Sequence, residues 1–171
     1  MLNIIEIRQK VSDLGTRIKA PRIYSAIPDM SSGDGTPHVE IIEDEYHYVT
    51  SERGSETSRK VTKEIDQLLF WIFEDIIFSM ANSFELKNRI QNKDSRRLYF
   101  TKEIELFKQI NPKWVERKKK KIESILKSVP YDDDADKRVE LCIKLTNSGY
   151  SSENAYEKAC EKYPLPIPDN D

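Results

Sequence analysis

The sequence has little of what most catalytic and metal sites are built from. Its 171 residues include two cysteines, two histidines and five glycines. It has neither a glycine-rich phosphate loop nor a Gly-x-Ser-x-Gly nucleophile motif. Cys142 and Cys160 are isolated residues at apolar positions of expected helices, so we expect both to be reduced and packed. These shortages argue against a P-loop nucleotide-binding protein, a hydrolase with that serine motif and a disulfide-rich protein.

Long apolar runs are missing as well. The most apolar stretch, residues 68–81, includes Glu74 and Asp75 and is shorter than the ~20 residues of a membrane-spanning helix. The first residues show no basic region followed by an apolar stretch, which is the pattern of a signal peptide. We therefore expect a cytoplasmic protein that does not enter a membrane.

The net charge is close to zero, but the charges are unevenly distributed. The chain has 28 basic and 30 acidic residues, and a net charge of −2 gives no argument for a nucleic-acid or membrane partner. Residues 84–129 nevertheless carry 14 basic and 6 acidic side chains, whereas residues 130–171 carry 5 basic and 10 acidic ones. A basic middle between acidic ends predicts either pairing between segments or two faces of opposite charge.

The apolar pattern and the turn residues predict an α+β protein that is predominantly helical. Hydrophobic residues make up 37% of the chain, and its length suits a single domain, residues 1–171. Alternation near residues 38–61 predicts a small antiparallel β-hairpin or three-stranded sheet packed on a helical bundle, after a loop over residues 20–37. Residues 131–171 are expected to add a C-terminal helix pair and a proline-rich tail to a body formed by residues 1–130. Helices are predicted at about residues 3–15, 63–91, 94–110, 112–129, 134–147 and 152–163.

The two histidines are the first candidates for chemistry. His38 and His47 lie on the two expected strands, where Glu40 or Glu45 could join them in a metal site or a small hydrolase site. No helical His-x-x-x-His pair and no cysteine pair supports such a site. We therefore expect solvent-facing or hydrogen-bonded histidines, no metal site and no cofactor.

A carboxylate pair, Glu74 and Asp75, lies inside the most apolar helix. Adjacent positions on a helix point about 100° apart, so these two side chains do not converge on one substrate atom. Buried carboxylates need partners. We expect Arg96 and Arg97, at the start of the following helix, to pair with them. Contact of these carboxylates with a partner is the alternative.

Four consecutive lysines, residues 118–121, form the strongest local charge run. Consecutive residues spread around a helix, and Trp114 is the one aromatic nearby for base stacking, so the run predicts a solvated face. The aliphatic stem of Lys118 can complete the apolar stripe of its helix. A nucleic-acid-binding regulatory domain that uses residues 87–121 remains the alternative.

Two acidic clusters lie beside tyrosines, one at the expected hairpin tip and the other at a helix start. Their members are Glu43, Asp44, Glu45 and Tyr46, and Tyr131, Asp132, Asp133, Asp134 and Asp136. Such combinations are typical of protein interfaces, because charge speeds the encounter and tyrosine anchors the contact. The alternatives are a solvated turn for the first cluster and a complement to the helix dipole for the second.

A set of short motifs follows along the chain in a fixed order. They are Pro-His-Val-Glu at 37–40, Tyr-His-Tyr-Val at 46–49, Glu-Arg-Gly at 52–54, Leu-Leu-Phe-Trp-Ile-Phe-Glu-Asp at 68–75, Met-Ala at 80–81, Phe-Glu-Leu at 84–86, Arg-Arg at 96–97 and Asn-Pro-x-Trp at 111–114 within a matching stretch over 106–117. In this order and spacing they resemble the Immunity protein 63 family, bacterial immunity proteins of polymorphic toxin systems. The resemblance covers roughly residues 1–130. It implies that the shared residues are mostly fold determinants, among them Trp71, Phe73, Glu74, Asp75, Arg96, Arg97 and Trp114.

The resemblance implies a cytosolic protein, not an enzyme, that binds and neutralises the C-terminal domain of a cognate toxin, often in contact-dependent growth inhibition. A nuclease-type toxin would present a basic substrate groove. We therefore expect the two acidic clusters to contact the toxin. A toxin that acts through an acidic surface would instead meet the lysines of residues 113–121.

Overall fold

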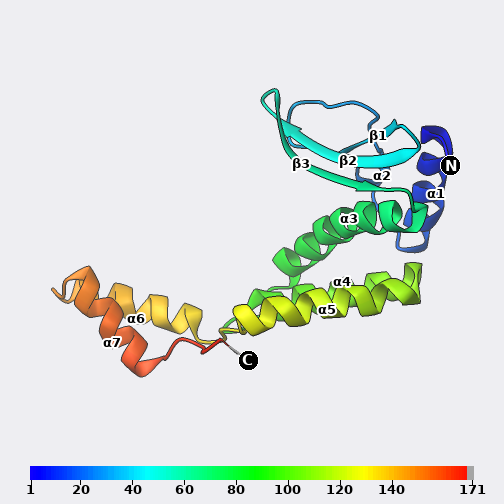
Figure 1. The fold of residues 1–171 in the computed structure, drawn as a ribbon. Coiled ribbons are helices and arrows are strands. Elements are labelled where there is room, and N and C mark those ends of the chain that lie inside the picture. The colour runs from blue at the N-terminus through cyan, green and yellow to red at the C-terminus, as the bar shows by residue number, and fades with distance from the viewer. Residues whose placement is uncertain (169–171) are drawn as a thin grey trace. The chain divides into compact units, whose positions relative to one another are not determined.

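The structure is a computed structural model that describes residues 1–168 (Figure 1). Three antiparallel strands and seven helices form this part of the chain, which confirms the predicted α+β, predominantly helical fold. No helix within it is long and apolar enough to span a membrane. The elements are α1 (Ile4–Arg17), α2 (Arg22–Ser25), β1 (His38–Ile42), β2 (Glu45–Glu52), β3 (Ser55–Thr62), α3 (Ile65–Asn88), α4 (Ser95–Ile110), α5 (Pro112–Ser128), α6 (Ala135–Asn147) and α7 (Ser152–Lys162).

Contacts within the chain divide it into two compact units. Unit 1 comprises residues 1–80 and 106–114, and unit 2 comprises residues 81–105 and the described residues from 115 onward. The boundaries fall inside α3, α4 and α5, so each of these helices contributes residues to both units.

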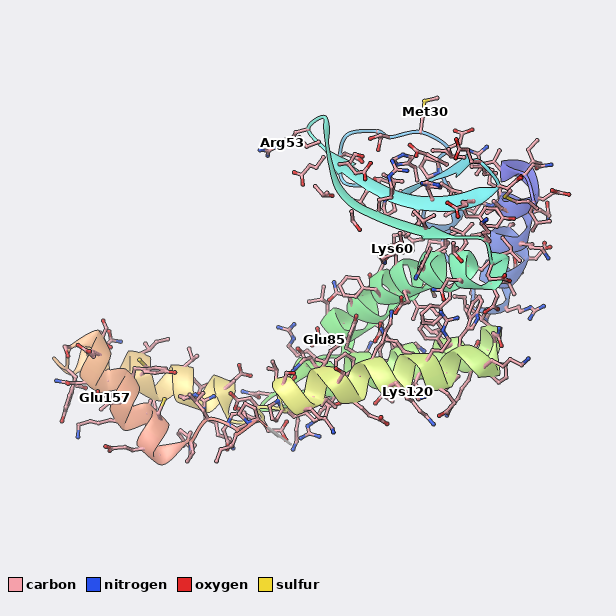
Figure 2. All side chains as sticks on the ribbon, viewed as in Figure 1. Met30, Arg53, Lys60, Glu85, Lys120 and Glu157 are labelled. Atoms are coloured by element: carbon pink, nitrogen blue, oxygen red, sulfur yellow. The ribbon has the colours of Figure 1, made fainter. Side chains whose placement is uncertain are left out.

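Two tight hairpins give the sheet of unit 1 its order β1–β2–β3. Glu43 and Asp44 connect β1 to β2 with φ angles of 46° and 62°, and Arg53 and Gly54 connect β2 to β3 with 52° and 81°. Two successive positive φ angles define the type I′ turn, whose twist matches that of the strands it joins. Figure 2 shows Arg53 at the tip of the second hairpin. The three-stranded sheet predicted near residues 38–61 is therefore confirmed.

One face of the sheet packs on α3. Tyr46 and Tyr48 are buried on this face, and Lys60 of β3 lies 5.8 Å from the ring centroids of both Tyr48 and Trp71 (Figure 2). The loop over residues 20–37 contains the one-turn helix α2 and is tied to the sheet where the N–H of Val39 donates to the carbonyl oxygen of Pro28 (3.0 Å). The segment before β1 is thus part of the folded unit.

An aromatic cluster forms the core of unit 1. The ring centroid of Phe70 lies 5.8 Å from that of Phe107 and 5.9 Å from that of Trp114, which also packs on Phe73 at 6.0 Å. Trp114 is 2% exposed, and its indole N–H donates to Asp66 (3.0 Å). The cluster brings the first half of α3 together with residues 106–114.

Unit 2 contains a buried ion pair between α4 and α5. The Nζ of Lys118 lies 2.7 Å from Oε1 of Glu103, with side-chain exposures of 12% and 0%. The hydroxyl of Tyr99 donates to the same carboxylate oxygen (3.1 Å). The head group of Lys118 therefore lies inside the unit, where the sequence predicted a packed stem beneath a solvated charge.

The helices α6 and α7 form a hairpin in unit 2 with a small apolar core. Ala155 and Ala159 of α7 are fully buried. Arg138 of α6 is also buried, and its guanidinium donates to the carbonyl oxygens of Tyr163 (2.7 Å) and Pro164 (3.3 Å). A single arginine thus fastens the start of the proline-rich tail to the helical hairpin.

Candidate functional site

The β1–β2 hairpin tip (Glu43, Asp44 and Glu45) projects negative charge from unit 1. Among the described residues, the carboxylates of Glu43 and Asp44 have no ion-pair or hydrogen-bond partner, and both side chains are exposed. Glu45 lies 3.8 Å from the Nζ of Lys63. The hairpin tip therefore offers two carboxylates whose charge is available to a partner.

Tyr46, which follows the hairpin tip, is not accessible to a partner. It is 1% exposed, and its hydroxyl accepts the backbone N–H of Leu2 (2.7 Å). The sequence places Tyr46 beside the hairpin tip, but the period-two alternation of the strand turns its ring to the face that packs on α3. We therefore correct the expected role of Tyr46 from surface anchor to core residue.

The aspartate cluster (Asp132, Asp133, Asp134 and Asp136) is largely neutralised within unit 2. Asp132 pairs with Arg138, and Asp134 pairs with Lys137 (2.7 Å). Asp133 accepts from the guanidinium of Arg97 (2.8 Å) and from Lys93 (3.1 Å). Asp136 is exposed and has no hydrogen-bond partner among the described residues. Three of the four carboxylates therefore stabilise the start of the α6–α7 hairpin.

A reciprocal pair of hydrogen bonds joins the start of α4 to the segment before α6. The backbone N–H of Asp132 donates to the carboxylate of Asp94 (2.8 Å), and the backbone N–H of Asp94 donates to that of Asp133 (3.0 Å). Arg96 also binds Asp94 (2.6 Å) and donates to the carbonyl oxygen of Pro130 (2.7 Å). Such contacts satisfy carbonyl groups after the end of α5.

Arg96 and Arg97 thus have partners in unit 2, in place of the expected pairing with Glu74 and Asp75. The guanidinium of Arg97 also lies 4.1 Å from the ring centroid of Tyr131, within the range of a cation–π contact. Tyr131 is accordingly half-buried against the start of α4. The ring of Tyr131 therefore packs against Arg97 of the same chain.

The acid groups of this junction predict sensitivity to low pH. Hydrogen bonds from Arg97 and from the N–H of Asp94 hold the pKa of Asp133 well below its usual value. Burial raises the pKa of Asp94, but hydrogen bonds from Arg96 and the N–H of Asp132 outweigh it and lower the pKa. Because both values lie below those of the unfolded chain, the stability they contribute is present above about pH 4 and is lost as the pH falls.

We expect Asp133→Asn to lower the free energy of unfolding at neutral pH, with the difference from wild type shrinking between about pH 5 and pH 2. Urea unfolding over a pH series measures this. Asp136→Asn, which removes a carboxylate of the same cluster without a hydrogen-bond partner in the described chain, is the matched control. Equal effects of the two variants at all pH values would contradict the assignment.

The two histidines lie on the sheet face opposite α3, in one polar network. His38 is buried, and its Nε2 lies 3.2 Å from Oε1 of Glu40. The guanidinium of Arg59 donates to Oε2 of Glu40 (2.8 Å) and lies 2.7 Å from Nδ1 of His47. Its hydrogen bond holds the pKa of Glu40 below the usual value despite partial burial.

A cation already occupies the position that a metal would need between His47 and Glu40. No group of three His, Cys, Asp or Glu side chains within residues 1–168 has the geometry to hold a metal ion. Arg59 gives no local signal in the sequence, because the strand register brings its partners from β1 and β2. The arrangement is that of a salt-bridge network.

The lysines of α5 divide between internal pairing and solvent. Lys118 binds Glu103, and Lys119 pairs with Glu116 one turn earlier (2.9 Å). Lys120 is exposed (Figure 2). The run therefore does not form a continuous cationic stripe of the kind that follows a nucleic-acid backbone.

Comparison with known proteins matches part of the chain to a protein family. Residues 43–124 match the family model described as Immunity protein 63. The matched segment runs from the hairpin tip into α5 and confirms the family predicted from the motifs. No curated protein and no solved structure matches the chain. The family indicates toxin neutralisation in general and a toxin protein as partner.

Proposed function

We propose that the protein neutralises a cognate toxin domain by tight, stoichiometric and non-catalytic binding. The observation that carries this proposal is the Immunity protein 63 match over residues 43–124. The polar network of the sheet agrees with a non-catalytic role. Glu40 and His47, the candidates for a metal or hydrolase site, both contact Arg59. The proposed setting is the cytoplasm of a bacterium that uses a polymorphic toxin system such as contact-dependent growth inhibition.

The proposed partner is the C-terminal domain of a nuclease-type toxin, with a basic groove for nucleic acid. The exposed carboxylates of Glu43 and Asp44 have the charge and the freedom to meet such a groove. Within the aspartate cluster, the carboxylate of Asp136 is exposed, whereas Asp132 and Asp134 form ion pairs with basic residues of α6. The hairpin tip is therefore proposed as the principal electrostatic contact.

Co-expression with the toxin domain of the adjacent reading frame tests this function. We expect the cells to survive and the two proteins to purify as a stable equimolar complex. Death of the cells, or a neighbouring frame whose product does not bind, would refute the immunity function. Retention on DNA or RNA that weakens steeply with salt would instead favour the nucleic-acid alternative.

The double variant Glu43→Asn/Asp44→Gly separates binding from folding at the hairpin tip. Asn-Gly is the preferred pair of a type I′ turn, because asparagine and glycine adopt positive φ angles at the least cost, so we expect the free energy of unfolding to rise by about 0.5–1 kcal/mol. Loss of two carboxylates should at the same time weaken toxin binding on the order of tenfold. Denaturant unfolding and calorimetry of the complex measure the two opposite changes.

The second hairpin supplies the matched control. Arg53→Asn creates the same Asn-Gly turn between β2 and β3 without removing negative charge. It should stabilise the protein and leave toxin affinity unchanged. Unaltered affinity in the Glu43→Asn/Asp44→Gly variant would show that the hairpin tip does not contact the toxin.

A further inference from the structure

A cavity of about 310 Å³ lies within unit 1, lined by α2 and the loop that follows it, by Tyr48 of β2 and by one side of α3. Most of its wall is apolar, formed by Ile27, Pro37, Ile72 and Ile76. Ile23 also lines it and is 79% exposed, so the wall includes a side chain that reaches solvent. The cavity is thus open to a group from outside.

A phenol and a carboxylate that line this cavity are hydrogen-bonded to each other. The hydroxyl of Tyr48 donates to Oδ2 of Asp75 at 2.6 Å. Burial, together with the charges of Asp75 and Glu74, raises the pKa of Tyr48 above its usual value, so the phenol stays protonated and acts as a donor. Asp75 is exposed, and it is the one charged residue among the described residues that line the cavity.

Apolar walls beside a single exposed carboxylate suit a long basic side chain. The aliphatic part of a lysine or arginine packs on apolar surface while its charged head stays near the mouth. An ammonium or guanidinium group then forms a charge-assisted hydrogen bond to the carboxylate. An anionic group would be repelled by Asp75, and a purely apolar group would leave the carboxylate desolvated at its side.

We infer that this cavity receives a lysine or arginine side chain of the toxin domain, as an anchor of the complex. The inference rests on the proposed function and adds a contact distinct from the hairpin tip. Buried anchor residues in pockets carry much of the binding energy of protein interfaces. Tyr48, Ile72 and Asp75 lie inside the family-matched segment, whereas Ile27 and Pro37 lie before it. Because part of the cavity wall lies outside the family-matched segment, we expect the shape of the cavity to be specific to the toxin of this protein.

Two variants test the anchor by different means. Asp75→Asn removes the charge and keeps an oxygen that can accept the Tyr48 hydrogen bond. Ala26→Trp places a large ring in the cavity from an exposed loop position, where damage to the fold is least expected. We expect each to weaken binding of the purified toxin domain by at least about 30-fold in calorimetry, as loss of a desolvated charge pair does. Asp75→Asn should also reduce the salt dependence of the affinity.

Matched controls separate this contact from general effects of charge and size. Glu123→Gln removes one exposed carboxylate from α5, and Ser31→Trp adds the same ring at an exposed loop position that does not line the cavity. Both should bind the toxin as wild type does. Thermal unfolding of every variant checks the fold, and Ala26→Trp carries the test if Asp75→Asn does not fold.

The outcomes distinguish this inference from the proposed function. If the wild type binds the toxin and neither cavity variant weakens binding, the anchor is refuted and the immunity function stands. Loss with Ala26→Trp but not with Asp75→Asn would show an apolar occupant and overturn the assignment of a basic side chain. If the wild type itself does not bind the toxin, both proposals fail.

Discussion

Replacing Lys118 by methionine should destabilise the protein by about 3–5 kcal/mol. The variant removes the Lys118 cation from the fully buried carboxylate of Glu103, and removal of one partner of a buried ion pair costs this much. The hydroxyl of Tyr99 still donates to Glu103, but a neutral donor does not compensate the charge. Urea unfolding at neutral pH measures the loss.

The neighbouring lysine provides the control for this prediction. Lys119 is 46% exposed and pairs with an exposed Glu116, so Lys119→Met should cost less than about 1 kcal/mol. In Lys118→Met the destabilisation should shrink as the pH falls, because the folded variant gains more than the unfolded chain from protonating Glu103. Glu103→Leu/Lys118→Met should recover most of the lost stability. Equal costs at positions 118 and 119 would contradict the buried pair.

Replacing Trp114 by alanine is the second large change, with an expected loss of about 3–5 kcal/mol. The indole fills the space between Phe70 and Phe73, and its N–H satisfies Asp66. The alanine variant leaves a cavity in the aromatic cluster and removes that hydrogen bond. Chemical unfolding followed by circular dichroism measures the effect.

The other tryptophan of the chain is the natural comparison. Trp71 is half-buried beneath Lys60 on the sheet side of α3. Trp71→Ala should therefore cost distinctly less than Trp114→Ala, since part of its ring is already in contact with water. A larger loss at Trp71 would show that the aromatic cluster around Trp114 is not the principal core of unit 1.

Local signals in the sequence were sufficient for much of the fold. Asn3 and Glu6 form a capping box at the start of α1, and Pro112 occupies the first position of α5. The alternation of β2 and the two-residue turns predicted the sheet. These features depend on neighbours within a few residues, which a single sequence displays directly.

The candidate site was harder to predict, because its partners come from distant segments. Lys118 forms a buried ion pair with Glu103, which lies fifteen positions earlier and on another helix, and no periodicity of the sequence links the two residues. The aspartate cluster resembles a free acidic surface until the fold brings Arg97 and Arg138 to it. Tyr48 and Asp75 meet across the sheet and α3, although each belongs to a motif that predicted only the fold.

The passage of α3, α4 and α5 through both units determines how the chain can be divided. Unit 1 needs residues 106–114 as well as the N-terminal 80 residues, and unit 2 needs residues 81–105 as well as the segment that follows 114. A single cut after residue 80 therefore separates the first 80 residues from the strip that completes their core, including Trp114. Neither unit is a contiguous gene fragment. Split-protein reporters and deletion series that assume modular halves should yield unfolded pieces, whereas co-expressed complementary fragments have a route to reassembly.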